Sequence, residues 1–170
     1  MKKNLVLTGM MGVGKTTIGK SLSKTLKMKF IDTDRIIEQE TLMTIKDLFE
    51  KKGEDYFREI ENKITIAELK KTNCVIALGG GAFINQSIRN EILKNSVSFW
   101  LDLDVNLILQ RSLDKKKRPL LKERDVKKTL INIYEKRKEV YNLANFKINC
   151  KQNINSVLKE IINKYEPKRN

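Results

Sequence analysis

The chain has no histidine and only two cysteines, Cys74 and Cys150, among its 170 residues. The absence of histidine excludes a Ser-His-Asp triad, a histidine general base and a histidine-ligated metal. The cysteines lie far apart in the sequence, which excludes a disulfide framework, a four-cysteine zinc site and a CxxC redox pair. No apolar run approaches the ~18 residues of a transmembrane helix, and the apolar stretch near Met1 is too short for a signal peptide. We therefore expect a reduced, cytoplasmic protein with a single domain over residues 1–170.

Basic side chains outnumber acidic ones by 35 to 21, so the formal net charge is +14. Such an excess occurs in nucleic-acid-binding proteins and in proteins that attract phosphorylated small molecules. The lysines are scattered along the chain, and no repeated stripe of aromatic and basic residues is present. A solvated, lysine-rich surface is therefore the favoured interpretation. We expect neither a nucleic-acid partner nor a membrane partner.

Short apolar runs alternate with amphipathic segments along the chain. The runs predict five strands, at 4–8, 29–33, 73–78, 97–101 and 146–149. Helical spacing of apolar residues predicts helices at 15–27, 35–71, 86–94, 105–113, 125–143 and 154–165, with breaks near 42–43 and at Gly53. Alternating strands and helices predict an α/β protein with a parallel sheet covered on both faces.

The segment 9–16, GMMGVGKT, fits the phosphate-binding loop G-x-x-x-x-G-K-[ST]. Its glycines allow positive φ angles, so that successive N–H groups point at phosphates. Lys15 would place a charge on the β- and γ-phosphates, and the Thr16 hydroxyl would ligate Mg²⁺. The expected strand before and helix after the loop distinguish the motif from a glycine-rich turn that matches by chance. We predict nucleotide binding here.

Asp32 and Asp34 lie at the end of the second predicted strand. In an extended chain, alternate residues point to the same side. We therefore expect both carboxylates to face the crevice at the carboxyl ends of the strands, where open α/β sheets bind ligands. The alternative is that one of them caps the helix that follows, with Asp34 beginning that helix.

Three consecutive glycines, Gly79 to Gly81, follow the third predicted strand. One glycine suffices for a tight turn, so three indicate a close approach to a ligand. The sequence leaves two roles open for Arg58: contact with a ligand, or an ion pair with Glu61 three residues later on the same helix. The charged connector 114–121 contains Arg118 before Pro119 and is interpreted as a flap that covers phosphates and excludes water. The alternative, a solvated charge run, fits Lys115 to Lys117 well and Arg118 less well, because the proline holds the arginine in an extended backbone.

Together these motifs resemble the shikimate kinase family over nearly the whole chain. The resemblance rests on the phosphate-binding loop, on Asp32-x-Asp34, on Phe57-Arg58 with Glu61, on the triple glycine and on Arg118-Pro-Leu-Leu; Arg111 and Arg137 with Tyr141 complete it. The family often has a glycine near position 41 or 42, where this chain has Thr41 and Leu42. The loop motif alone is shared by a large superfamily, whereas the combination is specific.

The resemblance implies that the ATP γ-phosphate is transferred to the 3-hydroxyl of shikimate, with Lys15, Asp34 and Arg118 as catalytic residues. ATP contacts would come from Gly12, Val13, Gly14, Lys15, Thr16, Thr17, Arg111, Arg118 and Gln152. Shikimate contacts would come from Asp34, Arg58, Gly79, Gly80, Gly81 and Arg137, where Arg58 and Arg137 grip the carboxylate. Thr16 and Asp32 would serve one Mg²⁺ ion per subunit.

The implied fold is a three-layer α/β/α P-loop kinase with a five-stranded parallel sheet. A helical substrate-binding segment is expected at about 34–61 and a lid at about 112–124, and the protein is predicted to be a monomer. The alternatives are another small-molecule P-loop kinase, such as a gluconokinase, and a nucleotide-binding regulatory or nucleic-acid-binding protein. A nucleoside monophosphate kinase would usually carry Asp-Gly-Phe-Pro-Arg after the third strand, where this chain has Gly-Gly-Gly-Ala-Phe.

Overall fold

A computed structural model describes residues 3–113 and 123–168. Its strands form one sheet in the order β2-β3-β1-β4-β5, and every neighbouring pair is parallel. The strands are β1 (Asn4–Thr8), β2 (Lys29–Asp32), β3 (Cys74–Ala77), β4 (Ser96–Asp102) and β5 (Phe146–Asn149). The predicted five-stranded parallel sheet is confirmed.

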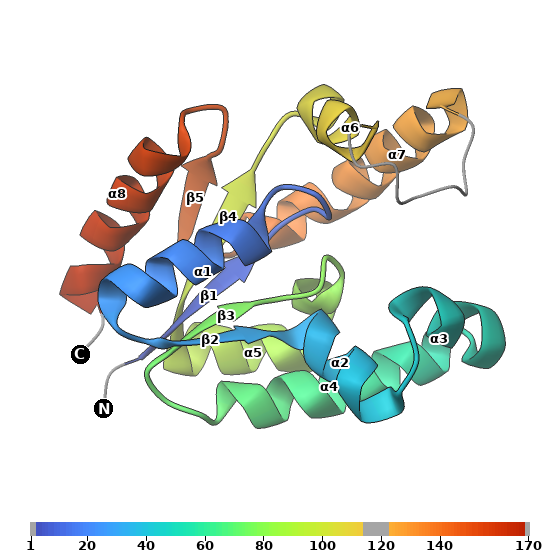
Figure 1. Ribbon diagram of the computed structural model, residues 1–170, viewed down its shortest axis with the longest axis horizontal. Helices are drawn as coiled ribbons and strands as arrows, with labels where there is room; N and C mark the ends of the chain where they lie inside the picture. Colours follow the sequence, from blue (N-terminus) through green and yellow to red (C-terminus); the bar gives the residue numbers. More distant parts are fainter. Residues whose placement is uncertain (1–2, 114–122, 169–170) are drawn as a thin grey trace.

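Helices cover both faces of this sheet, as Figure 1 shows. One face carries α1 and α8, and the other carries α4, α5 and α7. The helices of the described part are α1 (Lys15–Leu26), α2 (Thr33–Thr41), α3 (Ile45–Lys52), α4 (Glu54–Leu69), α5 (Gln86–Asn95), α6 (Val105–Leu113), α7 (Glu123–Tyr141) and α8 (Ile154–Tyr165). The predicted breaks near 42–43 and at Gly53 are confirmed, because they separate α2, α3 and α4.

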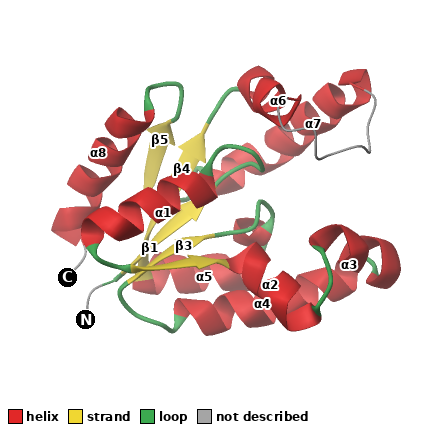
Figure 2. Ribbon diagram, in the orientation of Figure 1, coloured by secondary structure: helices red, strands yellow, loops and turns green. Residues whose placement is uncertain are grey.

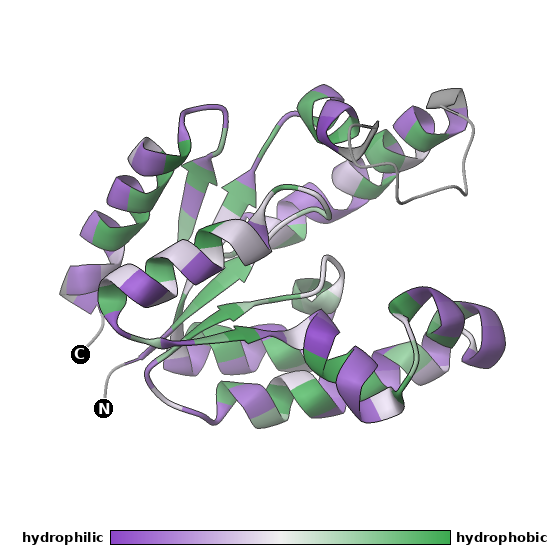
Figure 3. Cartoon of the chain, in the orientation of Figure 1, coloured by the Kyte–Doolittle hydropathy of each residue, from purple (hydrophilic) through white to green (hydrophobic). Residues whose placement is uncertain are grey.

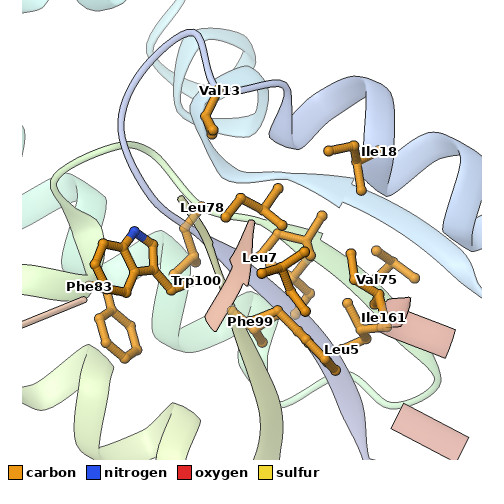
Figure 4. Packing of buried hydrophobic residues seen from close by; sticks show 14 of the residues in the cluster. Leu5, Leu7, Val13, Ile18, Val75, Leu78, Phe83, Phe99, Trp100 and Ile161 are labelled. Carbon is orange, nitrogen blue, oxygen red and sulfur yellow. The ribbon is translucent and has the colours of Figure 1, made fainter. Parts of the chain in front are cut away.

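The core forms around the central strands, because β1 and β3 are buried along their whole length. Strands covered on both faces favour continuous apolar runs, which is the pattern that predicted them. Figure 4 shows Leu5 and Leu7 of β1 among apolar side chains from β3, β4, α1 and α8. In Figure 3 the central strands are green, while the outer helices alternate green and purple.

A second, smaller cluster packs α2, α3 and α4 together, away from the main core. Its buried members are Ile37, Leu48, Phe57 and Ile64. The segment between β2 and β3 therefore has apolar packing of its own, which fixes the position of α4 and of the polar side chains on its surface.

The expectation that residues 32 to 34 continue the strand is wrong. Strand β2 ends at Asp32, and Thr33 already begins α2. Asp32 is the N-cap, since its Oδ1 accepts a hydrogen bond from the Arg35 N–H at 3.4 Å. The Thr33 hydroxyl fixes this turn by accepting the Gly79 N–H at 3.0 Å. The weighed alternative, with Asp34 in the first helical turn, is the one observed.

Because all five strands are parallel, the segments that follow β1, β2 and β3 leave the sheet at the same edge. Figure 2 shows the loops after β1 and β3, in green, at this edge. The candidate site is assembled there. Among the described residues, none of the helices has the length and apolar character needed to cross a membrane.

Candidate active site

The loop from Gly9 to Gly14 joins β1 to α1 and has the conformation that its motif predicts. Gly9, Gly12 and Gly14 have φ angles of 134°, 79° and 107°. These values lie in a region that residues other than glycine rarely adopt. Helix α1 begins at Lys15, so its N-terminus, which is the positive end of the helix dipole, faces the loop. The Lys15 Nζ donates to the carbonyl oxygens of Gly9 and Met10, both at 2.8 Å.

Thr16 and Asp32 lie side by side at the start of α1 and the end of β2. The Thr16 hydroxyl donates to Asp32 Oδ2 at 2.7 Å. In the described part of the chain, no group of three or more Asp, Glu, His or Cys side chains is placed to hold a metal. A hydroxyl beside a single carboxylate instead suits Mg²⁺, which keeps several waters and takes further oxygens from phosphates.

A cavity of about 350 Å³ lies beside the phosphate-binding loop. Its walls include Gly12, Val13, Thr17, Arg111, Cys150 and Gln152. The Arg111 Nη1 donates to the Val13 carbonyl at 3.3 Å, which ties α6 to the loop. The Gln152 amide donates to Glu160 Oε2 at 2.8 Å. The volume falls within the range of ordinary small-molecule sites.

The three glycines after β3 make room for two charged side chains and for the backbone of the phosphate-binding loop. Their φ angles lie outside the left-handed region, so backbone conformation does not explain them. A β-carbon built on Gly79 would lie less than 3.0 Å from Asp34 Oδ1, and one on Gly81 would lie 2.5 Å from Arg58 Nη1. A β-carbon on Gly80 would lie 3.3 Å from the Met11 N and 3.8 Å from Arg137 Nη1. The glycines therefore bring Asp34, Arg58 and Arg137 against one stretch of backbone, next to the phosphate loop.

Electrostatics at this edge of the sheet favour proton uptake by Asp34. The pKa of Asp34 is raised to about 6, mainly by burial and then by the nearby charge of Asp32. The positive charge of Lys15 opposes this shift. Glu61 has only 2% of its side chain exposed and pairs with Arg58 Nη1 at 2.7 Å. Burial raises the pKa of Glu61, and the pair with Arg58 opposes that shift.

Similarity to known proteins agrees with these features. A family model described as shikimate kinase matches residues 11–166. A shikimate kinase of Sulfurihydrogenibium sp. (strain YO3AOP1) is 43% identical over 163 residues, which cover 95% of this chain and 97% of that protein. The chain belongs to the shikimate kinase family. Members of the shikimate kinase family are ATP-dependent phosphotransferases.

Solved structures of shikimate kinases share the fold closely. The enzyme from Acinetobacter baumannii in complex with shikimate is 31% identical with a TM-score of 0.91, over 99% of this chain and 95% of that chain. The enzyme from Aquifex aeolicus is 33% identical with a TM-score of 0.85, over 97% of each chain. A gluconokinase from Sinorhizobium meliloti, with a TM-score of 0.64, is 13% identical over 99% of this chain and 94% of that chain, and shows the fold alone.

The structure gathers the residues that the shikimate kinase motifs single out into two groups. Lys15, Thr16 and Asp32 lie at the phosphate loop, and the cavity behind the loop holds Arg111 and Gln152. The second group surrounds the triple glycine and consists of Asp34, Arg58 and Arg137. Arg118 and most of the predicted lid lie outside the described residues, so their role stays a prediction.

Two residues at the site carry more contacts than their sequence context indicated. Glu61 was considered only as a partner for Arg58, yet it is buried and also faces Gly79. Tyr141 was noted only as part of a motif, yet its hydroxyl donates to the Gly80 carbonyl. Helical spacing gives a signal for the first, since Arg58 and Glu61 are three residues apart. No local signal reveals the second, because its partner is 61 residues away in the sequence.

Proposed function

We propose that this chain transfers the γ-phosphate of ATP to the 3-hydroxyl of shikimate, giving shikimate 3-phosphate and ADP, as a step of aromatic amino-acid biosynthesis. The observation that carries the proposal is the contact at Gly80. A β-carbon there would lie 3.3 Å from the Met11 N of the phosphate loop and 3.8 Å from Arg137 Nη1. The anion-binding loop and the cationic acceptor side thus meet at one glycine, which suits a reaction that depends on placing donor and acceptor together.

The donor side of the reaction falls to the phosphate loop. Backbone N–H groups of Gly12, Val13 and Gly14 and the start of α1 would hold the β- and γ-phosphates. Lys15 would turn from the Gly9 and Met10 carbonyls, to which it donates here, toward the transferring phosphate. The base and ribose would occupy the cavity between Arg111 and Gln152, with Thr17 at the loop side.

One Mg²⁺ ion fits beside Thr16 and Asp32, whose hydroxyl and carboxylate are 2.7 Å apart. When bound, the ion would neutralise charge on the β- and γ-phosphate oxygens. Thr16 would contribute its hydroxyl directly, and Asp32 would act through a water molecule. Asp32 is also the N-cap of α2, so the same residue would fix the helix that carries Asp34.

The acceptor side would use the fork of Arg58 and Arg137 for the shikimate carboxylate, because a guanidinium can donate two parallel hydrogen bonds. Arg58 is held in place by Glu54 and Glu61 on α4 and lies over the Phe57 ring at 5.1 Å. The backbone of Gly79 to Gly81 would line the sugar-like ring. These contacts orient the substrate so that its 3-hydroxyl faces Asp34.

Asp34 would accept the proton of the 3-hydroxyl while the new oxygen–phosphorus bond forms and the bond to ADP breaks. A pKa of about 6 leaves Asp34 ionised near neutral pH and still basic enough to take a proton. Arg118 would approach the phosphates from the lid at about 112–124. The substrate-binding segment at 34–61, a monomeric state and a cytoplasmic location complete the proposal.

The test is a phosphotransfer assay with Mg²⁺-ATP and three separate acceptors: shikimate, gluconate and AMP. We expect turnover with shikimate only, detected as ADP release and as shikimate 3-phosphate by mass spectrometry. Lys15→Ala serves as the control. It removes the lysine charge that would face the transferring phosphate, leaves the core untouched and should abolish turnover. A kcat/KM for gluconate or AMP equal to that for shikimate would contradict the proposal.

A further inference from the structure

Two side chains of one helix donate to the same carbonyl oxygen at the site. Tyr141 and Arg137 lie on α7, four residues apart, and therefore share a face of the helix. The Arg137 Nη1 donates to the Gly80 carbonyl at 3.1 Å. The Tyr141 hydroxyl donates to the same oxygen. Gly80 is also the residue that lies against the phosphate loop, so its position affects both halves of the site.

The surroundings of Tyr141 leave its hydroxyl little freedom. Its side chain is completely buried, and its ring packs against that of Trp100 with centroids 5.9 Å apart. Trp100 is itself only 3% exposed and lies under Gly9, where a β-carbon would be 3.4 Å from its Cδ1. Burial raises the pKa of the Tyr141 hydroxyl, so it keeps its proton and stays a donor at neutral pH.

Arg137, in contrast, has competing uses for its guanidinium. It donates to Gly80 in this structure, whereas the proposed function requires it to turn toward a carboxylate. If Arg137 were the sole donor to the Gly80 carbonyl, binding the substrate would free the centre of the loop formed by Gly79 to Gly81, here called the glycine loop, although Thr33 still holds the Gly79 N–H. A second, fixed donor on the same carbonyl removes this conflict.

We propose that Tyr141 is a positioning residue that holds the Gly80 carbonyl, so that Arg137 is available to the acceptor carboxylate while the glycine loop stays against the phosphate loop. The inference rests on the proposed function and deepens it. Tyr141 touches neither the reacting phosphate nor the acceptor hydroxyl in this scheme, and it acts through Gly80 and Arg137.

The chain offers a closely matched control for the loss of this hydroxyl. Tyr165 is also completely buried, and its hydroxyl also donates to a backbone carbonyl, that of Lys3, at 2.6 Å. It lies on α8, away from the glycine loop. Tyr141→Phe and Tyr165→Phe therefore delete the same atom from similar environments, and only the first change affects Gly80.

The experiment measures the shikimate KM, the ATP KM, kcat and the unfolding temperature of both variants and of the wild-type chain. We expect Tyr141→Phe to raise the shikimate KM by about 3- to 10-fold, the factor expected for one lost hydrogen bond, because Arg137 then has to serve both Gly80 and the carboxylate. The ATP KM should change less than about 2-fold, since Arg137 still holds the loop. Both variants should lower the unfolding temperature by similar amounts, because each loses one buried hydrogen bond. Tyr165→Phe should leave both KM values unchanged.

Either of two results overturns the inference: a shikimate KM that rises no more in Tyr141→Phe than in Tyr165→Phe, or a parallel rise of both KM values in Tyr141→Phe. Should Tyr141→Phe fail to fold, Arg137→Lys tests the same point. With Tyr141 still holding Gly80, that variant should raise the shikimate KM alone, and a matching rise of the ATP KM would show that Tyr141 does not hold the loop. A wild-type chain that does not phosphorylate shikimate would instead refute the proposed function.

Discussion

Adding a single methyl group to the glycine loop should separate the role of Asp34 from that of Arg58. The two changes are Gly79→Ala and Gly81→Ala. Neither glycine has a left-handed φ, so alanine introduces no backbone strain at either position. The new methyl groups would instead meet the Asp34 carboxylate and the Arg58 guanidinium.

The displacement can be worked out from the distances. In Gly81→Ala, Arg58 Nη1 would have to move from 2.5 Å to the 3.4 Å of ordinary contact, about 0.9 Å. In Gly79→Ala the Asp34 carboxylate would move by a comparable distance, and Glu61 Oε1, at 3.1 Å, would move less. Both obstructing groups are ends of flexible side chains, so the fold should tolerate the change. A misplacement of about 1 Å in a reacting geometry can cost a factor of ~10² in rate.

We therefore expect different kinetic signatures from the same chemical change. Gly79→Ala should lower kcat about 10- to 100-fold, because it moves Asp34, the proposed proton acceptor, with a smaller change in the shikimate KM. Gly81→Ala should mainly raise the shikimate KM, because it moves the carboxylate clamp. Steady-state kinetics and thermal unfolding of both variants provide the measurement. Identical losses in the two variants, or unfolding of either, would refute the reasoning from these contacts.

Three further outcomes are expected. The kcat of the wild-type chain should fall as the pH drops through about 6, since Asp34 must be ionised to accept a proton and its pKa is about 6. Asp34→Asn should lower kcat about 10²- to 10⁴-fold and should abolish this fall of kcat at acidic pH. A variant that keeps the fall would assign the titration to another group. Arg58→Lys should raise the shikimate KM about 10-fold while leaving calorimetric ATP binding unchanged, because it keeps the charge and loses the fork; an unchanged KM would leave Arg58 as a partner of Glu61 alone. Leu42→Gly should raise the unfolding temperature by about 1–4 °C. Leu42 ends α2 at a φ of 53°, which favours glycine, and 91% of its surface is exposed, so its side chain adds little packing energy. A lower unfolding temperature would contradict this.

The fold was predictable because its signals are local. The strands at 4–8 and 146–149 have the predicted bounds, since each is a short run with a clear change of pattern at its ends. The phosphate loop was equally readable, because its glycines are needed for positive φ angles that no other residue adopts easily.

The sequence around β2 left two geometries open and did not decide between them. The choice between an extended and a helical Thr33 depends on the bond from the Gly79 N–H to its hydroxyl, a contact between residues 46 positions apart. The reason for three glycines was only half visible for the same cause. A close approach was expected, but the groups that approach are Asp34, Met11 and Arg58, which come from two helices and from the loop after β1.

The arrangement of charges at this edge explains how Asp34 acquires basicity while Asp32 and Glu61 are held by other partners. Asp32 is engaged by Thr16 and by the α2 backbone, and Glu61 is engaged by Arg58. Asp34 is left with burial and three nearby acidic groups, Asp32, Glu61 and Glu38, that disfavour its charge, against the opposing effect of Lys15. Because its folded pKa lies above the ordinary value of 3.8 for an aspartate, its protonated form favours folding, and that contribution is lost as the pH rises through about 6. At neutral pH the ionised carboxylate therefore lowers the stability of the fold, and the same raised proton affinity suits the role that we propose for Asp34, which is to take the proton of the acceptor hydroxyl.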